Sequence, residues 1–425
     1  MRSSAIDISR IGRIVRVRQS QLPQFVEYAF YALILYAIIA EAWGISVPLV
    51  GAGGRALLAI YSIWRLRKSI RSVYDPVGLA LCCAVTFLIV QVVFHDDSVM
   101  SSANREIVNW IFTLIIVQSL LVREHFLQRF GISAVVMGAL LIPYLVANYG
   151  NASTATIERA GLDSSVGMAN PDELAAWFGF CCVFAVIVSI ETKRNMIRLA
   201  SFCVAIACLG IVGMTVTRAA LIGIIIAVVL ALRRVLKRGF LPVLLLAALV
   251  SVVVVSGLFD QAVTSFSARG TEDSGRFAVW PIAFQRFLAS PLFGVGAEQI
   301  ATYVPEMNKE ITPHNAFLYV GLMSGIIPLA FFVAFWFKAI KGAYELSGSG
   351  LQDASFQLPL IVYTLIQAFF LAGLFMSSWA IVVLCNAIPR PQRKFLLVGG
   401  GHNLGELSRR PREELARSRS IPANS

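Results

Sequence analysis

His314 lies in the segment ITPHNAF, directly before an apolar run long enough to cross a bilayer, and is one of only four histidines. Histidine titrates near neutral pH, so its imidazole can take a proton from a hydroxyl group as a general base. A lone histidine here is more often a helix cap or a residue at the lipid interface than a catalytic base. Its chemistry therefore depends on which charged residues share its side of the membrane.

Two arginines are candidates to act with this histidine. Arg218, in TVTRAALIG, occupies a short turn between two apolar runs. A charge there either faces a polar partner or snorkels to lipid headgroups. Arg276 follows Gly275 at a predicted helix start, where backbone N–H groups favour an anion. Together the two guanidinium groups would suit a diphosphate better than a neutral sugar. Arg269 and Arg286 are weaker candidates.

The composition is that of a membrane protein, with 57% hydrophobic and 14% charged residues. A net charge of +12 fits lysines and arginines retained on the cytoplasmic side, so nucleic acid is not an expected partner. All seven cysteines lie in apolar runs, so we expect small buried side chains without disulfides or zinc. The sequence contains no P-loop, and nothing indicates direct use of ATP.

Apolar runs predict membrane spans along almost the whole chain. The predicted spans are 25–43, 49–64, 77–94, 107–122, 132–149, 174–190, 199–214, 219–232, 240–259 and 315–337. The last apolar block, 358–388, is too long for one crossing, and Gly373, Ser377 and Ser378 mark a hairpin within it. The chain is therefore predicted to have about twelve spans.

The distribution of basic residues predicts the orientation of these spans. With the N-terminus inside, most lysines and arginines face the cytoplasm, as the positive-inside rule requires. The sequence then divides into a basic cytoplasmic segment 1–24, one integral membrane domain 25–388 and a basic, disordered cytoplasmic tail 389–425. The basic residues left facing outward are Arg55, Arg105, Arg159, Arg218, Arg269, Arg276, Arg286 and Lys309.

Two outward loops, 150–173 and 260–314, are large enough to do more than connect spans. The first ends in ANPDELAAW, where Asn170 and Pro171 predict a helix start with Asp172 and Glu173 in its first turn. The second contains GRFAVWPIAFQRFLAS, which predicts an amphipathic interfacial helix that Pro281 breaks or delays. Its apolar face would contain Phe277, Trp280, Phe284 and Phe287.

At these residues the chain resembles the bacterial O-antigen ligase and polymerase superfamily, integral membrane enzymes that act on undecaprenyl-diphosphate-linked glycans. The resemblance rests on SVGMANPDELAAW, TVTRAALIG, SGRFAVWPIAFQRFLASPLFGVG and TPHNAFLYVGLMSGIIPL, which occur in the family's order and cover residues 161–329. The chain departs from the family in reading NPDE for the commoner NPNE, and GIIPL for GLIGL. The first departure leaves the role of Asp172 open.

The resemblance implies an all-α helical bundle of the GT-C kind in the bacterial inner membrane, with the active site on the periplasmic face. The charge distribution and the even number of spans place both termini in the cytoplasm. It implies a metal-independent, inverting glycosyltransferase with a lipid-diphosphate donor and no cofactor. Carried over by motif, Arg218 and Arg276 bind the donor diphosphate, and His314 activates the acceptor hydroxyl. Further candidate substrate-binding residues are Arg286, Asn315, Asn170 and Asp172.

Several functions remain open. GRFAVW resembles the GRxxxW form of exopolysaccharide polymerases, which slightly favours a polymerase over a ligase that transfers the glycan to lipid A core. Possible partners are membrane lipids, a chain-length regulator and a flippase. A transporter or flippase would instead place ionisable groups at mid-membrane depth, where only Glu41 and Gln91 are candidates. A scaffold in an assembly complex is a third alternative.

Overall fold

The computed structural model describes residues 26, 28–33, 53–66, 76–99, 101–120, 126–147, 171–236, 276–305, 308–347 and 354–370. Most of the first predicted span, the predicted span 240–259, the hairpin near Gly373 and both terminal segments lie outside these ranges. The total of about twelve spans and the orientation of the loops therefore stay predictions.

The described chain is mostly helical. Its first half contains α3 (Gly54–Leu66), α4 (Pro76–Ile89), the π-helical turn η2 (Val90–Phe94), α5 (Ser102–Leu120), α6 (Phe126–Ala147), α7 (Pro171–Glu191), α8 (Asn195–Met214) and α9 (Arg218–Leu236). The second half contains α12 (Arg276–Ala289), β1 (Thr302–Val304), β2 (Lys309–Ile311), α13 (Ala316–Ser324), α14 (Ile326–Ser347) and α15 (Ala354–Phe370).

Among the described residues, 4 helical segments are long and apolar enough to cross a membrane. They are Pro76–Phe94, Pro171–Glu191, Asn195–Met214 and Ile326–Ser347, and Arg129–Pro143 and Phe356–Phe370 are shorter apolar helices. The helices predicted at 77–94, 174–190 and 199–214 are thus confirmed. Each agrees with the predicted run to within four residues at either end, the usual uncertainty of helix boundaries being one or two residues.

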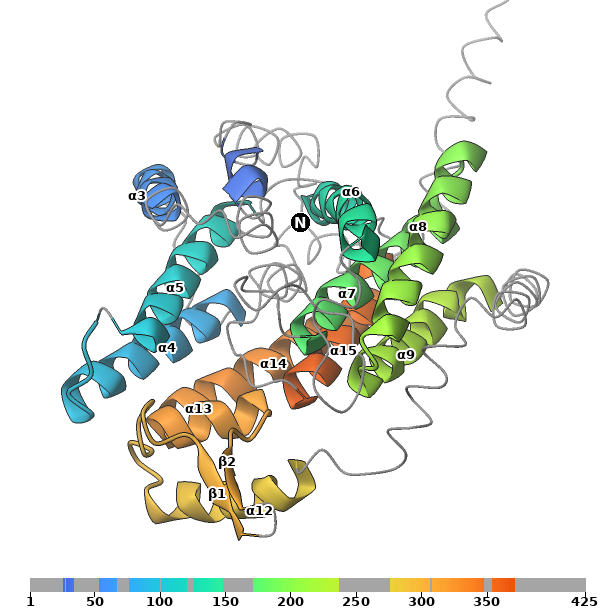
Figure 1. Ribbon diagram of the computed structural model, residues 1–425. Coiled ribbons are helices and arrows are strands. Elements are labelled where there is room, and N and C mark those ends of the chain that lie inside the picture. Colours follow the sequence, from blue (N-terminus) through green and yellow to red (C-terminus); the bar gives the residue numbers. More distant parts are fainter. Residues whose placement is uncertain are drawn as a thin grey trace, which may run out of the picture.

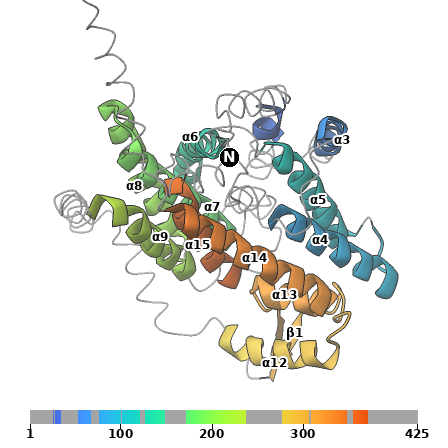
Figure 2. The same ribbon diagram turned by 180° about the vertical axis from the view of Figure 1, so that it is seen from behind.

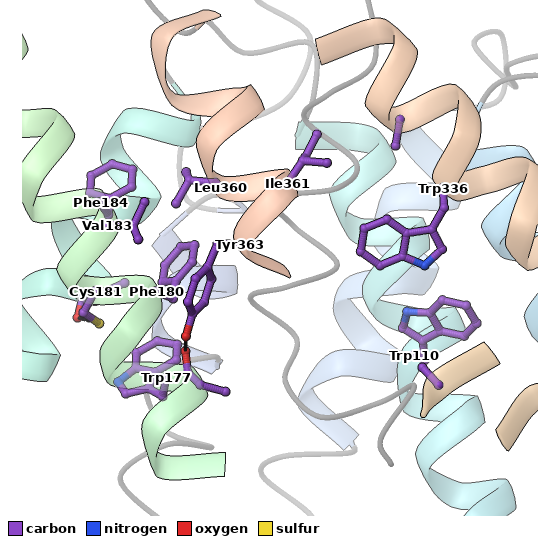
Figure 3. Packing of buried hydrophobic residues seen from close by; sticks show 14 of the residues in the cluster. Trp110, Trp177, Phe180, Cys181, Val183, Phe184, Trp336, Leu360, Ile361 and Tyr363 are labelled. Atoms are coloured by element: carbon purple, nitrogen blue, oxygen red, sulfur yellow. Dashed lines mark hydrogen bonds between the residues drawn. The ribbon is translucent and has the colours of Figure 1, made fainter. Parts of the chain in front are cut away.

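Helix α7 forms the centre of the fold. It is apolar on all sides, as a fully surrounded helix must be, and packs against α6, α8, α9 and α15. Tyr363 of α15 donates a hydrogen bond to the carbonyl oxygen of Ala176 at 2.9 Å, and Figure 3 shows this hydroxyl directed at α7 beside Trp177. A buried tyrosine needs such a partner for its hydroxyl. The N-terminus of α7 is therefore held in a fixed position.

The prediction of one continuous span over 315–337 is wrong, because the helix breaks at Gly325 between α13 and α14. Gly325 has φ +80°, a conformation that glycine adopts without steric cost. The amide of Ile326 donates to the carbonyl oxygen of Pro291 at 2.8 Å, so the turn after α12 fills the break. The break thereby fixes α12 against the start of α14.

The prediction of an all-α fold is corrected by a small antiparallel hairpin. Strands β1 and β2 pair Tyr303 with Glu310, and the Tyr303 hydroxyl donates to Oδ1 of Asn308 at 2.7 Å. Strands of three residues are too short to show the alternating pattern that identifies a strand in sequence. Figures 1 and 2 show this hairpin between α12 and α13.

Most of the described cysteines are buried as predicted: Cys83, Cys181, Cys182 and Cys208 are buried, and Cys82 is partly buried. Cys203 differs, because it is exposed on α8, a helix with most of its surface outside the bundle. Cys385 lies outside the described residues.

Candidate functional site

The N-terminus of α7 supplies a carboxylate to the candidate site. Helix α7 begins at Pro171 with Asp172 and Glu173 in its first turn, which confirms the predicted helix start. The Asp172 side chain is 16% exposed, and both of its oxygens accept contacts from distant parts of the chain. Asn170 lies outside the described residues. Asp172 is therefore placed at a junction between segments.

The turn between α8 and α9 is the first of these segments. Helix α8 ends at Met214 and α9 begins at Arg218, so the predicted short turn is confirmed. The Thr217 hydroxyl donates to Oδ1 of Asp172 at 2.9 Å. Because Thr217 directly precedes Arg218, this hydrogen bond holds the start of α9 next to Asp172. Arg218 itself is partly exposed.

The start of α12 is the second segment. Arg276 is its first residue, as predicted, and Nη2 of Arg276 lies 3.3 Å from Oδ2 of Asp172. The guanidinium carbon is 6.0 Å from the centre of the Phe370 ring, within cation–π range. The Arg276 side chain is 17% exposed, so much of its charge is removed from bulk solvent. Electrostatic contacts are stronger in such a site than in water.

The predicted character of α12 needs two corrections. The helix continues through Pro281 without a break, although a proline in its second turn removes one backbone hydrogen bond of the helix. Phe284 is exposed as the interfacial prediction requires, but Phe287 is buried against the bundle. The indole of Trp280 donates a hydrogen bond to the carbonyl oxygen of Pro313 at 2.7 Å. Trp280 therefore faces the site and not the lipid interface.

His314 follows Pro313 and lies in the electrostatic field of the other two groups. Its backbone φ is +44°, a left-handed conformation that is uncommon for residues other than glycine. The Thr312 hydroxyl lies 3.4 Å from its Nε2. Partial burial lowers the pKa of His314 below its ordinary value, the positive charge of Arg276 lowers it further, and the negative charge of Asp172 opposes this. The imidazole is therefore neutral at neutral pH and able to accept a proton.

Two of the other candidate residues are bound to the protein itself. Arg286 donates to the carbonyl oxygens of Ala301 and Gln299, each at 2.7 Å, and to the Thr302 hydroxyl at 3.1 Å. Asn315 caps α13, with Oδ1 accepting from the amides of Phe317 at 3.0 Å and Leu318 at 3.1 Å. Both residues hold the local fold. Arg269 lies outside the described residues.

Sequence reasoning missed Thr217 and Trp280 as parts of the site. The signal for Thr217 was its position directly before Arg218, in a short turn that keeps both residues at the same end of α9. The signal for Trp280 was its place one helical turn after Arg276, since residues four apart share one face of a helix. Within the described ranges, no group of three or more His, Cys, Asp or Glu side chains is placed to hold a metal ion.

The comparisons with known proteins agree with the motifs. Residues 203–333 match the family model described as O-antigen ligase. That segment contains Arg218, Arg276 and His314 and ends within α14. No curated protein matches the chain significantly. The match supports the resemblance drawn from the motifs: residues 203–333 are similar to the O-antigen ligase family.

Proposed function

We propose that this protein is an inner-membrane glycosyltransferase that moves a glycan from undecaprenyl diphosphate to a sugar hydroxyl on the periplasmic face. The observation that carries this proposal is that Arg276 contacts Asp172 and that both of these charges act on the pKa of His314. Arg276 and His314 lie inside the segment that matches the family, and Asp172 lies before it. In the proposed topology about twelve spans hold both termini in the cytoplasm, and the loops 150–173 and 260–314 face the periplasm.

The reaction is a displacement at the anomeric carbon of the donor sugar. The acceptor hydroxyl oxygen forms a bond to that carbon, and the bond between the carbon and the diphosphate oxygen breaks. The lipid diphosphate leaves with the bonding electrons, the acceptor proton passes to His314, and the anomeric configuration inverts. Arg276 and Arg218 stabilise the charge that develops on the leaving group, because fixed cations in a water-poor site act strongly on such charge. Neither a metal ion nor a nucleotide is required in this proposal, since the donor is already activated.

The lowered pKa of His314 supports its role as the base. A neutral imidazole is the form that can take the acceptor proton, and both burial and Arg276 favour that form. The same neutrality avoids a third positive charge beside the leaving group. After the transfer, the imidazolium is stabilised by the nearby Asp172 carboxylate.

A transporter is less well supported, because Gln91 has a structural role. Its Nε2 donates to the carbonyl oxygen of Met323 at 2.6 Å, and its Oε1 accepts from the amide of Ala297 at 3.1 Å. A buried side chain engaged at both ends with backbone groups joins segments of the fold. It is not placed to line a transport path. Glu41 lies outside the described residues.

The test uses the full chain in lipid nanodiscs. The donor is the lipid-linked glycan extracted from a strain in which the gene for this protein is deleted. We expect transfer by the wild type and losses of about a hundredfold or more for Arg218→Ala, Arg276→Ala and His314→Ala. Arg105→Ala removes an exposed charge on α5 and serves as the control that keeps wild-type activity. Wild-type turnover by both Arg218→Ala and His314→Ala would refute the proposed site.

The acceptor is tested separately in the deletion strain. A polymerase, which the GRFAVW segment slightly favours, joins repeat units, so its loss leaves only single units on the cell surface. A ligase transfers finished glycan to lipid A core, so its loss leaves long glycan on the carrier lipid. Electrophoresis of the surface and lipid-linked glycans distinguishes these two outcomes.

A further inference from the structure

The hydrogen bonds of Thr217 and Arg276 to Asp172 form one connected unit, which we call the carboxylate bridge. We infer that Asp172 is a positioning residue: its carboxylate holds the α8–α9 turn and the start of α12 against α7, so that Arg218, Arg276 and His314 act on one donor. This inference rests on the proposed function and goes beyond it. It assigns Asp172 a role other than binding substrate.

The bridge joins segments that are far apart in the sequence. Thr217 is separated from Asp172 by 45 residues and Arg276 by 104. The two carboxylate oxygens are divided between them, one for each partner. A single carboxylate on the buried, central helix α7 thus fixes the positions of both arginine-bearing segments relative to each other.

Backbone strain beside Thr217 shows why the turn needs an anchor. Val216 is buried and has φ +53°, a left-handed conformation that is unfavourable for a β-branched residue. Such conformations persist only where surrounding contacts enforce them. The hydroxyl of the next residue, Thr217, is held by Asp172, and the Thr215 hydroxyl donates to the carbonyl oxygen of Val212 at 2.6 Å. Without the bridge, the turn that ends at Arg218 loses one of these two restraints.

The charge of Asp172 makes direct donor binding unfavourable. A carboxylate beside a diphosphate is repelled by it, whereas the same carboxylate attracts Arg276 and orients its guanidinium group. Among the residues that the structure describes, the groups that shift the pKa of His314 are Arg276 at the start of α12 and Asp172 at the start of α7. Asp172 therefore also raises the proton affinity of His314 against the effect of Arg276.

Three variants separate the two roles of the bridge. Asp172→Asn keeps an oxygen for Thr217 but removes the negative charge, and presents an amide where Arg276 needs an acceptor. Thr217→Val removes the hydroxyl at nearly constant volume and leaves every charge in place. Thr217→Ser restores the hydroxyl. Each full-length variant is assayed in nanodiscs with the same extracted lipid-linked glycan, over a range of pH and with thermal unfolding recorded in parallel.

We expect Asp172→Asn to lower kcat by about ten- to a hundredfold, the range for loss of a charge-assisted hydrogen bond. The acidic limb of its pH–activity profile should move to lower pH, because His314 loses a negative charge that raises its pKa. Thr217→Val should lower kcat without moving this limb, and Thr217→Ser should recover most of the activity. The Arg105→Ala control should retain both the rate and the limb.

Two results would overturn the inference. The first is wild-type kinetics and an unmoved acidic limb in Asp172→Asn. The second is a loss in the bridge variants that follows the fraction of unfolded protein, with Thr217→Ser no better than Thr217→Val. If Asp172→Asn does not fold, the Thr217 pair still decides between positioning and a structural role. Failure of the proposed function is distinct, because there His314→Ala would be as active as the wild type.

Discussion

The indole of Trp280 donates a hydrogen bond to the carbonyl oxygen of Pro313 at 2.7 Å, and so joins the helix that begins at Arg276 to the loop that carries His314. Trp280 lies one helical turn beyond Arg276, which places the two side chains on the same face of α12. The Trp280 ring also packs against Phe370, with ring centroids 6.3 Å apart. The separation between the candidate cation and the candidate base therefore depends on this tryptophan.

Replacing Trp280 by Phe should reduce activity while leaving the protein folded. Phenylalanine keeps the contact with Phe370 but cannot donate to Pro313, so the His314 loop loses one restraint. A neutral hydrogen bond contributes about 1 kcal/mol, which corresponds to roughly a fivefold loss in kcat. Single-turnover transfer rates measure this loss, and Phe284→Leu on the exposed side of α12 is the matched control. Equal rates for the two variants would contradict the positioning role of Trp280.

Activity should persist to lower pH than an unperturbed histidine would allow. The base acts when His314 is neutral, and burial and Arg276 both lower its pKa. Activity is therefore full above the lowered pKa and is lost as the pH falls through it. The pH dependence of kcat/KM in the wild type measures this limb. A limb at or above the ordinary histidine pKa would contradict the assignment of His314 as the base.

Arg276→Gln should shift His314 in the opposite direction. Removing the guanidinium charge abolishes one of the causes that lower the pKa of His314, so that pKa should rise. Because this variant is expected to transfer glycan poorly, the measurement is the rate of modification by diethyl pyrocarbonate against pH. The same variant with His314→Gln supplies the background from the other histidines. An unchanged titration would show that Arg276 and His314 are not electrostatically coupled.

Local sequence signals predicted the three places where site-bearing helices begin. Proline followed by acidic residues marks Pro171, and glycine before an amphipathic run marks Arg276, because these residue types satisfy or complement a helix N-terminus. The turn before Arg218 followed from the lengths of two apolar runs. Each of these signals involves residues close together in the sequence, so it can be recognised without knowledge of the fold.

Contacts between distant segments could not be predicted in this way. Nothing in NPDE indicates that Asp172 accepts hydrogen bonds from Thr217 and Arg276. These partners depend on how α7, α9 and α12 pack against one another. The break at Gly325 was missed for a related reason. Hydropathy continues unchanged across that glycine, and only the docked turn after α12 determines that the helix is interrupted there. The contacts of Arg286 were not predicted either, because its backbone partners Gln299 and Ala301 lie in the loop before β1, which has no distinctive sequence pattern.

Arg286→Lys should reduce stability more than catalysis. Lysine keeps the charge but cannot reach the carbonyl oxygens of Ala301 and Gln299 together, since it lacks the planar fork of a guanidinium group. The loss of hydrogen bonds made by a charged group should cost about 1.5–3 kcal/mol. Thermal unfolding measures this cost, while the KM for the lipid-linked donor should remain near the wild-type value. A large increase in KM with unchanged stability would instead assign Arg286 to donor binding.

Gly325→Ala should be strongly destabilising, although it lies outside the site. A Cβ at Gly325 would collide with the carbonyl oxygen of Leu292, and the φ of +80° is itself strained for alanine. The expected cost is more than about 2 kcal/mol, because the backbone cannot relax without moving the turn after α12. Gly53→Ala is the matched control, since a Cβ there meets no atom within 4 Å. Both variants are compared by thermal unfolding in the same detergent. Equal midpoints would show that the interrupted helix does not depend on glycine at this position.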